Sequence, residues 1–588
     1  MADEWDDSPA PSGGAGRGFS NGFGDDDAWS PGGGDGDFGG GRGGRGGRGG
    51  RGGFGRRDDD GEGGGFRGGR GGRGGRGGGR GGRREDGEDG GGGFRGRRRD
   101  DDGDNGGFQD ADGEGGENGE GGEEKPKPVT YIPPEIDDPD EMFAMGISSG
   151  INFNKYDKIA VNVSGENAPP PVATFEAANL RALLLENVKR SGYVKPTPVQ
   201  KYALPIVMAG RDLMASAQTG SGKTGGFLLP ILNKLLQEPV DLVTDGDHTE
   251  PQAVIVSPTR ELTNQIFTEA KKFASGSVIK VCVAYGGAAV RHQADKVRAG
   301  CHVLVATPGR LMDFVNRGRI TFSSIRFVVL DEADRMLDMG FLPEMEKMMK
   351  HETMVPKGER QTLMFSATFP EEVQTLARQF LQDYIFLAVG PVGGANDDVT
   401  QTILEVDRNK KRDTLLEMLT SGELDKTMIF VETKRNADFL AAFLSGKDLP
   451  TTSIHGDREQ REREEALRDF TRGSMKILVA TAVAARGLDI KGVAHVINYD
   501  MPKSVDEFVH RIGRTGRVGN TGRATSFYDA ANDSAIAGDL AKILRDANQE
   551  VPSFLEGFSA AGGFSAGTSD IRGGGGTTHV LEKEEEEW

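Results

Sequence analysis

Two adjacent carboxylates, Asp331 and Glu332, directly follow the apolar run 327–330, which has the composition of a buried strand. Like charges at the end of a strand repel each other, and burial raises the pKa values of carboxyl groups unless a cation or water accompanies them. The pair therefore predicts a metal site at this strand end. An alternative is the N-terminus of a helix, where the helix dipole also favours acidic residues.

A second candidate site lies upstream, where the apolar run 213–217 passes through a Gly-rich turn into an amphipathic helical pattern. Backbone N–H groups of such a turn bind phosphate oxygens at the helix N-terminus. Lys223 is then expected to reach the β- and γ-phosphates, and the Thr224 hydroxyl to bind Mg²⁺. The strict form of the pattern begins with glycine, but Ala217 stands there. The turn residues expected to hold the nucleotide are Ala217, Gln218, Thr219, Gly220, Ser221 and Gly222.

The two candidate sites are expected to be neighbours, because ligands bind at the carboxyl ends of the strands in an open parallel sheet. Asp331 would then bind Mg²⁺ through water, together with Thr224. Glu332 would orient and deprotonate the water that attacks the γ-phosphate, a role that needs a carboxylate close to that phosphate.

The elements that must position these residues lie between about 172 and 555, where short β-branched runs alternate with amphipathic helical patterns. This alternation is typical of βαβ units and parallel sheets, and the length favours two domains. Cys282 and Cys301 form no metal-binding pair and are expected to be core thiols. No apolar run is long enough for a membrane span, so we expect a cytoplasmic protein with no membrane partner.

Eight short motifs follow one another along this region, each after a strand-like run. They are AQTGSGKT (217–224), PTREL (258–262), GG (286–287), TPGR (307–310), DEAD (331–334), SAT (366–368), ARGLD (485–489) and HRIGRTGR (510–517). In this order they resemble the motifs of the DEAD-box RNA helicases. The resemblance implies an α/β protein with two tandem RecA-like domains, at 172–390 and 400–550, joined by a linker at 391–399 and preceded by an extended flank at 126–171.

The resemblance also assigns the nucleotide, which is ATP. Gln200 would bond the edge of adenine and Phe175 would stack on the base, since a side-chain amide offers a donor and an acceptor together. A position as core anchor is the alternative for Phe175. Asp489 would hold the ribose hydroxyls, for which bonding to loop backbone groups is the alternative.

From the second domain, Arg514 and Arg517 would act as arginine fingers on the γ-phosphate, because the planar guanidinium pairs bidentately with phosphate oxygens. His510 would link the γ-phosphate site to Ser366 and Thr368. For His510 too, satisfaction of loop backbone groups is the alternative.

The remaining motifs resemble contacts to the RNA backbone, which carry no base code, so binding is expected to be independent of sequence. Closure of the two domains on ATP and RNA would couple the two ligands, separate short duplexes locally and end with hydrolysis. The residues expected to contact RNA are Pro258, Thr259, Arg260, Gly287, Thr307, Gly309 and Arg310 in the first domain, and Gln460, Arg463 and Thr481 in the second.

The ends of the chain differ from this core. The formal net charge is -19, and residues 1–124 hold 18 Arg against 28 Asp and Glu, so −10 of it belongs to this tail. Ranges 1–125 and 551–588 are expected to be disordered. Nine RGG triplets between Arg42 and Gly82 predict a tail that binds RNA and granule proteins and associates with itself, whereas the core is expected to be monomeric.

The flanks GINFNKYDKIAVNVSG (150–165) and VPSFLEGF (551–558), with the terminal EKEEEEW, resemble the germline subfamily of these helicases, the Vasa type. That resemblance implies germ granules, germ-cell development, the piRNA pathway and translational regulation. A general translation-initiation helicase is an alternative, and a granule scaffold with an RNA-clamping core is another. The intact set Lys223, Glu332 and Arg514 argues against a scaffold. Gly225 and Gly226 stand where the family has alanines, which is expected to loosen the helix by up to about 1 kcal/mol per glycine.

Overall fold

The computed structural model describes residues 131–135, 138–144, 159–218, 220–390, 398–422, 424–485, 490, 492–516 and 521–558, and the backbone of 577–579. Every described residue belongs to one unit of the chain, 120–588. The RGG triplets and the acidic end of the C-terminal tail lie outside the described residues, so their predicted disorder and binding stay predictions.

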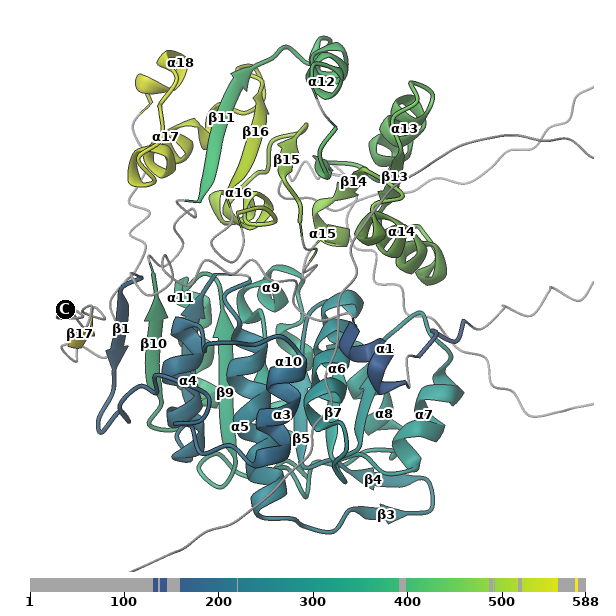
Figure 1. The fold of residues 1–588 in the computed structure, drawn as a ribbon, viewed down its shortest axis with the longest axis vertical. Helices are drawn as coiled ribbons and strands as arrows, with labels where there is room; N and C mark the ends of the chain where they lie inside the picture. The colour runs from purple at the N-terminus through teal and green to yellow at the C-terminus, as the bar shows by residue number, and fades with distance from the viewer. Residues whose placement is uncertain are drawn as a thin grey trace, which may run out of the picture. The chain divides into compact units, whose positions relative to one another are not determined.

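The first domain is built on a nine-stranded sheet, drawn in Figure 1. Its inner strands are parallel, whereas the two at one edge run antiparallel to their neighbours. Every residue of most inner strands is buried, as expected for a sheet covered on both faces. In spatial order the strands are β17 (Thr577–His579), β1 (Val161–Ser164), β10 (Ile385–Val389), β2 (Leu213–Ala217), β9 (Gln361–Ser366), β8 (Phe327–Leu330), β5 (Ala253–Val256), β7 (Val303–Ala306) and β6 (Val281–Ala284).

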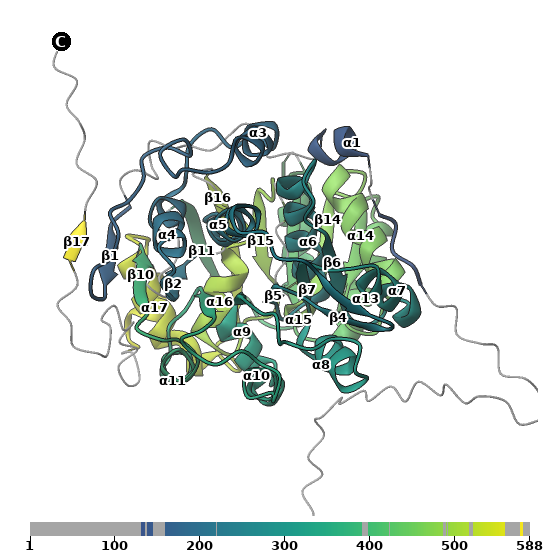
Figure 2. The same cartoon turned by 90° about the horizontal axis from the view of Figure 1, so that it is seen from below.

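Helices cover both faces of this sheet, as Figure 2 shows, and each face has its own apolar core. A small hairpin of β3 (Val243–Asp245) and β4 (His248–Glu250) lies beside the sheet. The helices of the first core are α3 (Ala182–Arg190), α4 (Pro198–Met208), α5 (Lys223–Gln237) and α6 (Arg260–Ala274). Those of the second core are α7 (Val290–Arg298), α8 (Pro308–Asn316), α9 (Ala333–Asp338), α10 (Leu342–Met349) and α11 (Glu371–Phe380).

The second domain repeats this plan with six parallel strands and a separate apolar core on each face. Its strands, in spatial order, are β11 (Val399–Glu405), β16 (Gly522–Tyr528), β15 (His495–Asn498), β12 (Thr427–Val431), β14 (Ile477–Thr481) and β13 (Thr451–Ile454). Its helices are α12 (Lys411–Thr420), α13 (Lys434–Ser445), α14 (Gln460–Arg472), α15 (Ala482–Ala485), α16 (Val505–Ile512), η1 (Ser534–Ile536), α17 (Ala537–Asp546) and α18 (Ser553–Glu556).

The predicted fold class, two tandem parallel α/β domains, is confirmed. The ordered regions reach further than the predicted ranges. In the flank, α1 (Pro139–Ala144) is a short helix and β1 extends the first sheet. Beyond 550, Leu555 of α18 is buried and the Phe554 ring stacks on Tyr528, with the ring centroids 5.6 Å apart. Apolar contacts of this kind offset the entropy cost of ordering the chain, so residues 551–558 pack on the second domain.

Six of the eight predicted motifs begin at or just after the end of a parallel strand of the first sheet, whereas ARGLD begins at the end of α15 and HRIGRTGR on α16. Because parallel strands point the same way, their carboxyl ends share one edge of the first sheet, and these six motifs gather there. Several loops end in a capped helix: Thr259 accepts a hydrogen bond from the Leu262 N–H at 3.4 Å and so begins α6. Within the part of the chain that the structure describes, we find no helix with the length and apolar character that spanning a membrane demands.

Candidate functional site

The turn between β2 and α5 has the backbone of a phosphate-binding loop. Gly220 and Gly222 adopt left-handed φ angles of 84° and 90°, a conformation that glycine takes without steric cost. A Cβ at Gly222 would lie 2.8 Å from Gln200 Nε2 and 2.8 Å from Thr197 Oγ1, so a larger residue would displace both. Thr219, another predicted turn residue, lies outside the described residues. The turn ends at the N-terminus of α5, where free N–H groups favour an anion.

Lys223 is buried inside this turn. Its ammonium donates hydrogen bonds to the carbonyl oxygens of Ala217, at 2.7 Å, and Gln218, at 3.4 Å. Burial lowers the pKa of Lys223, and the nearby charges of Asp331 and Glu332 oppose that shift. The structure therefore brings the predicted phosphate-binding lysine together with the predicted acid pair.

The acid pair lies at the end of β8 and is almost completely buried. Burial raises the pKa of Asp331 to about 7, Lys223 counteracts the shift, and the Glu332 charge adds to it. Asp331 Oδ1 accepts a hydrogen bond from the Glu332 N–H at 3.0 Å. Glu332 has φ 55° and ψ 52°, which costs a non-glycine residue about 1 kcal/mol. Such strain commonly occurs at functional sites.

These residues fit a magnesium ion. Burial and the neighbouring Glu332 charge disfavour the ionised form of Asp331. A nearby cation would stabilise that ionised form. The Thr224 hydroxyl, at the first turn of α5, adds a second oxygen donor. Among the described residues, no cluster of three or more His, Cys, Asp or Glu could hold a metal by itself. Two protein oxygens match Mg²⁺, which usually keeps waters and substrate phosphates as its other ligands.

Asp334 connects the acid pair to the second domain, a role that the sequence analysis missed. Its Oδ2 accepts hydrogen bonds from the N–H groups of Ala367, at 3.2 Å, and Thr368, at 2.9 Å, and from the Thr368 hydroxyl at 2.9 Å. His510 Nε2 lies 3.6 Å from the same oxygen. Although burial raises it, the pKa of Asp334 is lowered overall by its interaction with His510, by the charges of Arg335 and Lys223 and by the hydrogen bond from the Thr368 N–H.

The predicted link from His510 to Ser366 and Thr368 therefore runs through Asp334. Thr368 shares the Asp334 carboxylate with His510, whereas the buried Ser366 hydroxyl has no hydrogen-bond partner among the described residues. Burial and the Arg335 charge lower the pKa of His510 well below its usual value. The prediction for His510 was incomplete because it named Ser366 and Thr368 as partners and omitted Asp334, the third carboxylate of the DEAD motif.

Arg514 lies just beyond the end of α16, and its side chain is buried. Its Nε donates to the His510 carbonyl oxygen at 3.1 Å, which fixes the base of the guanidinium next to the Asp334–His510 pair. The buried Arg335 guanidinium lies 3.6 Å from Glu332 Oε2 and adds positive charge on the other side. The second predicted finger, Arg517, and the predicted ribose ligand, Asp489, lie outside the described residues.

Gln200 and Phe175, the predicted adenine contacts, belong to the first domain's core. Gln200 Oε1 accepts from the Thr197 N–H at 3.0 Å, and its Nε2 donates to the Gly222 carbonyl at 2.9 Å, so this side chain supports the phosphate-binding turn. The Phe175 ring is buried and meets Tyr193 edge-on at 6.2 Å. These contacts suit the core-anchor alternative for Phe175, and its stacking on adenine stays a prediction.

The predicted RNA contacts of the first domain lie at the starts of α6 and α8 and in the loop after β6. Arg260 passes over Gly287, whose φ of 78° and missing Cβ make room for the guanidinium. Arg310 Nη1 donates to Gln293 Oε1 at 3.2 Å. The other members of this set are Pro258, Thr259, Thr307 and Gly309, of which Thr259 and Thr307 are helix N-caps.

The two domains touch through residues of the predicted RNA set. Arg260 Nη1 donates to Gln460 Oε1 at 3.2 Å, and Arg463 Nη2 lies 2.8 Å from Glu261 Oε1. Thr481 stands at the end of β14 in the second domain. Glu261, the acidic partner, was missed, since an acidic side chain gives no sequence signal for RNA binding. Its position next to Arg260 in the PTREL motif was the available hint.

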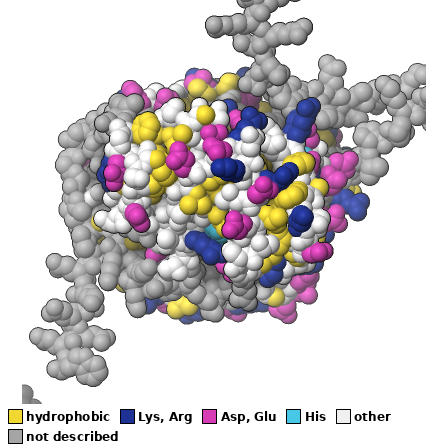
Figure 3. Space-filling view, turned by 90° about the horizontal axis from the view of Figure 1, so that it is seen from above, with side chains coloured by type: hydrophobic (Ala, Val, Ile, Leu, Met, Phe, Trp, Pro, Cys, Tyr) yellow, Lys and Arg dark blue, Asp and Glu magenta, His cyan; other side chains and the backbone are white. Residues whose placement is uncertain are grey.

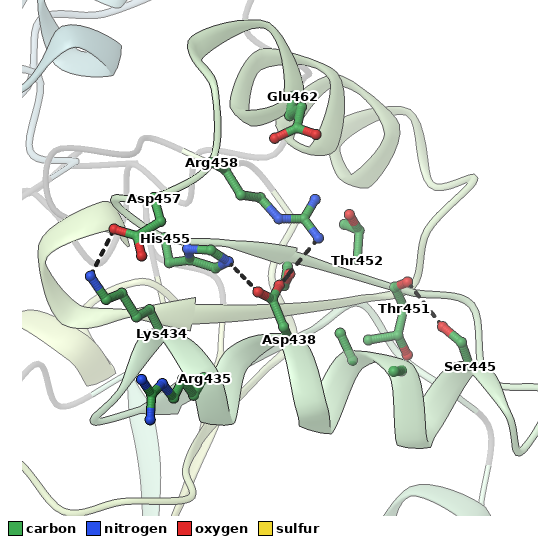
Figure 4. A pocket seen from close by; sticks show the side chains of 13 residues that line it. Lys434, Arg435, Asp438, Ser445, Thr451, Thr452, His455, Asp457, Arg458 and Glu462 are labelled. Atoms are coloured by element: carbon green, nitrogen blue, oxygen red, sulfur yellow. Dashed lines mark hydrogen bonds and ion pairs between the residues drawn. The ribbon is translucent and has the colours of Figure 1, made fainter.

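A separate polar hollow of about 640 Å³ lies in the second domain between α13, β13 and the start of α14, as Figure 4 shows. Several of its polar side chains pair with one another: Lys434 with Asp457 at 2.8 Å, and His455 Nε2 with Asp438 at 2.8 Å. None of the predicted site residues line this hollow. On the face drawn in Figure 3, basic and acidic side chains are likewise interspersed with apolar ones.

Comparison with known proteins gives matches for both domains. Residues 197–376 match the DEAD/DEAH box helicase family, and residues 410–519 match the helicase conserved C-terminal domain. The chain is 58% identical over 468 residues to the ATP-dependent RNA helicase vasa of Drosophila melanogaster, a match that covers 78% of this chain and 69% of that protein. It is 55% identical over 448 residues to the probable ATP-dependent RNA helicase DDX4 of Homo sapiens, covering 76% of this chain and 61% of that one.

Solved structures resemble the same part of the chain. Dbp5 of S. cerevisiae, bound to RNA and ADP BeF3, matches with a TM-score of 0.56 and 28% identity, over 65% of this chain and 95% of that one. Mss116p bound to ssRNA and AMP-PNP matches with a TM-score of 0.56 and 27% identity, over 66% of this chain and 82% of that one.

Proposed function

Because the chain belongs to the DEAD-box family of ATP-dependent RNA helicases, we propose that it works as a Vasa-type enzyme that remodels RNA–protein complexes and unwinds short duplexes locally. The observation that carries this proposal is the pair of contacts between the domains. On one side Asp334 meets His510 beside the acid pair, and on the other Arg260 meets Gln460 among the predicted RNA contacts. One movement of the two domains would therefore act on both ligands.

On the nucleotide side, the turn at 218–222 and Lys223 would bind the phosphates of ATP, with Gln200 and Phe175 toward the base. Mg²⁺, held by Thr224 and through water by Asp331, would neutralise charge on the β- and γ-phosphates. Glu332, close by and held at the strand end, would take the proton of the attacking water. Arg514 would reach the γ-phosphate from the second domain and favour the charge distribution of the transition state.

On the RNA side, guanidinium, hydroxyl and backbone N–H groups would bind phosphate and sugar oxygens, so the enzyme would accept RNA of any sequence. RNA and ATP would each favour the closed arrangement, and so each would raise the affinity for the other. Hydrolysis would remove the γ-phosphate that joins the domains, and RNA would then be released.

The test is ATP hydrolysis by the full chain with and without single-stranded RNA, beside Glu332→Gln. We expect RNA to stimulate the wild type, and the variant to retain RNA and ATP while its turnover falls by about 10² to 10⁴. Hydrolysis that does not respond to RNA in the wild type would refute the helicase cycle and leave an RNA-clamping scaffold as the better account.

The subfamily supplies the cellular part of the proposal. The 58% identity to the Drosophila protein supports a role in germ-cell development, germ granules, the piRNA pathway and translational regulation in the cytoplasm. The RGG triplets would bind RNA and granule proteins through weak multivalent contacts, which arginine methylation would weaken. Imaging of the endogenous protein tests this, with granules in germ cells as the expected result. Uniform expression in all tissues would favour a translation-initiation helicase instead.

A further inference from the structure

The flank segment, defined here as residues 131–135 and 138–144, lies on the first domain although it precedes the predicted core. The Ala289 N–H donates to the Tyr131 carbonyl at 2.8 Å, and Glu135 forms an ion pair with Lys296 on α7. Farther along, the Arg190 guanidinium lies 4.1 Å from the centroid of the Phe143 ring. Main-chain, ionic and aromatic contacts therefore hold this segment on the first domain.

Tyr131 of the flank segment also reaches the second domain. Its hydroxyl donates a hydrogen bond of 2.6 Å to Oε2 of Glu464, a residue of α14 that is 333 positions away. Burial together with this bond raises the pKa of Tyr131, so the hydroxyl stays protonated and remains a donor at neutral pH. A hydrogen bond to a carboxylate is stronger than one between neutral groups. The flank segment is thus in contact with both domains.

The contact continues to Gln460 and Arg260, two of the residues expected to contact RNA. The other oxygen of Glu464 accepts from Gln460 Nε2 at 3.0 Å, and Gln460 Oε1 accepts from Arg260 Nη1 at 3.2 Å. A carboxylate can only accept, so Glu464 forces the amide nitrogen of Gln460 toward itself and the amide oxygen toward Arg260. With the amide reversed, two donors would face each other. Glu464 therefore sets the orientation in which Gln460 can meet Arg260.

We propose that Tyr131 is a positioning residue for RNA binding, because its hydroxyl holds Glu464, and through it Gln460 and Arg260, in the arrangement that exists when the two domains are in contact. The inference rests on the proposed helicase function. The flank segment, anchored on the first domain, would then prolong the time that the closed enzyme stays on RNA. Loss of the Tyr131 hydroxyl removes one charge-assisted hydrogen bond between the domains. The contacts of the flank segment with the first domain use other groups and are kept.

The experiment compares full-length wild type with Tyr131→Phe, which loses the hydroxyl and keeps the ring. Release of labelled single-stranded RNA is timed in the presence of AMP-PNP, and RNA-stimulated ATP hydrolysis is measured over a range of RNA concentrations. We expect RNA release to become about tenfold faster, in line with the loss of one bond to a charged group. The KM for RNA should rise by a similar factor, while kcat at saturating RNA and hydrolysis without RNA stay within about twofold.

Tyr499→Phe is the matched control, since Tyr499 is a half-buried tyrosine on the second domain that packs against Phe527 and lies outside this chain of contacts. It should leave RNA release unchanged. Glu464→Ala provides a second test: it removes the acceptor of both the Tyr131 bond and the Gln460 bond, so adding Tyr131→Phe to it should change RNA release little further.

Three results would overturn the inference while the helicase function stands: wild-type RNA release in Tyr131→Phe, equal effects of the two phenylalanine variants, or a further full acceleration of RNA release when Tyr131→Phe is added to Glu464→Ala. A wild type without RNA-stimulated hydrolysis would refute the proposed function first, and the inference with it. The two failures are therefore distinguishable.

Discussion

The two places where the domains meet are held in different ways. On the phosphate side, Asp334 is fixed by two backbone N–H groups and the Thr368 hydroxyl before it meets His510, and all three side chains are largely buried. On the RNA side, Arg260 and Gln460 meet through the ends of long side chains, as do Glu261 and Arg463.

The contact on the phosphate side is therefore rigid, whereas the ion pair between Glu261 and Arg463 on the RNA side is exchangeable. A carboxylate bound by backbone groups keeps its geometry, which suits a site where small displacements are costly for catalysis. The Arg463 guanidinium, paired with the Glu261 side chain, can exchange that partner for a phosphate oxygen with little rearrangement, because both are oxygen acceptors. Under the proposed function, the phosphate side would suit the reaction, and the RNA side would suit taking up and releasing a ligand.

The largest effect is expected on the phosphate side, from Arg514→Ala. The guanidinium lies beside the Asp334–His510 pair, and its removal should lower RNA-stimulated kcat by about 10³ or more. RNA affinity without nucleotide should hardly change. Arg514→Lys, which keeps a charge and loses the planar fork, should recover only a small part of the rate. Steady-state hydrolysis measures this, and a loss below tenfold would contradict the assignment of Arg514 as a finger.

On the RNA side, Arg463→Ala should weaken RNA binding by about tenfold and to the same extent for unrelated sequences, because a phosphate contact carries no base information. The slope of log affinity against log salt concentration should fall by about one. Fluorescence anisotropy at several salt concentrations measures both quantities. Arg463→Lys should retain the salt slope, and a loss that depends on RNA sequence would speak against a backbone contact.

A third, smaller effect concerns Asp506, which faces the phosphate side from α16. Burial and the charges of Asp334 and Asp338 raise its pKa to about 6. Its ionisation therefore destabilises the folded protein: this cost is absent below about pH 4, grows as the pH rises toward 6 and is complete above it.

Asp506→Asn removes this cost, so it should stabilise the protein at pH 8 by about 1 kcal/mol more than at pH 4.5, with partial exposure taken into account. Urea unfolding at the two pH values measures the difference. Asp413→Asn, at an exposed carboxylate of α12, is the control. An Asp506→Asn effect of equal size at both pH values would contradict the raised pKa of Asp506.

The smallest effect concerns Gly225 and Gly226 in α5, the helix that follows the phosphate-binding turn. At Gly226 a Cβ would meet the Ala203 methyl at an ordinary 3.5 Å, so Gly226→Ala should stabilise α5 by about 0.5 to 1 kcal/mol. At Gly225 a Cβ would lie 2.8 Å from Gln200 Nε2. Gly225→Ala should therefore gain no stability and should weaken ATP binding by disturbing the Gln200–Gly222 bond. Thermal unfolding and nucleotide titration of the two variants distinguish these outcomes.

Much of the fold and of the nucleotide site could be predicted because the signals are local. Apolar β-branched runs such as 327–330 define strands, and a Gly-rich turn followed by Lys223 defines a phosphate loop over a few residues. The acid pair Asp331 and Glu332 was found in the same way, from its place at a strand end. For these features, secondary structure alone brings the residues together.

The features that were missed depend on residues far apart in the chain. Asp334 meets His510 across 176 positions, Glu261 meets Arg463 across about 200, and Tyr131 meets Glu464 across 333. An acidic residue next to a basic motif has no distinguishing pattern, because a surface carboxylate looks the same in the sequence. For Phe175 the sequence had left two positions open, stacking on adenine and core anchor, and the placement of its neighbours shows that the ring is buried.

By itself, then, the sequence determined the two α/β domains, the phosphate-binding turn and the acid pair, since hydrophobic periodicity and turn chemistry act over short distances along the chain. Tertiary structure alone decided which side chains face one another between the domains: the carboxylate that His510 meets, the acid that pairs with Arg463 and the tyrosine that supports Gln460. The reason is physical. Hydrogen bonds and ion pairs require separations of about 3 Å, which only the packed fold can set between distant residues.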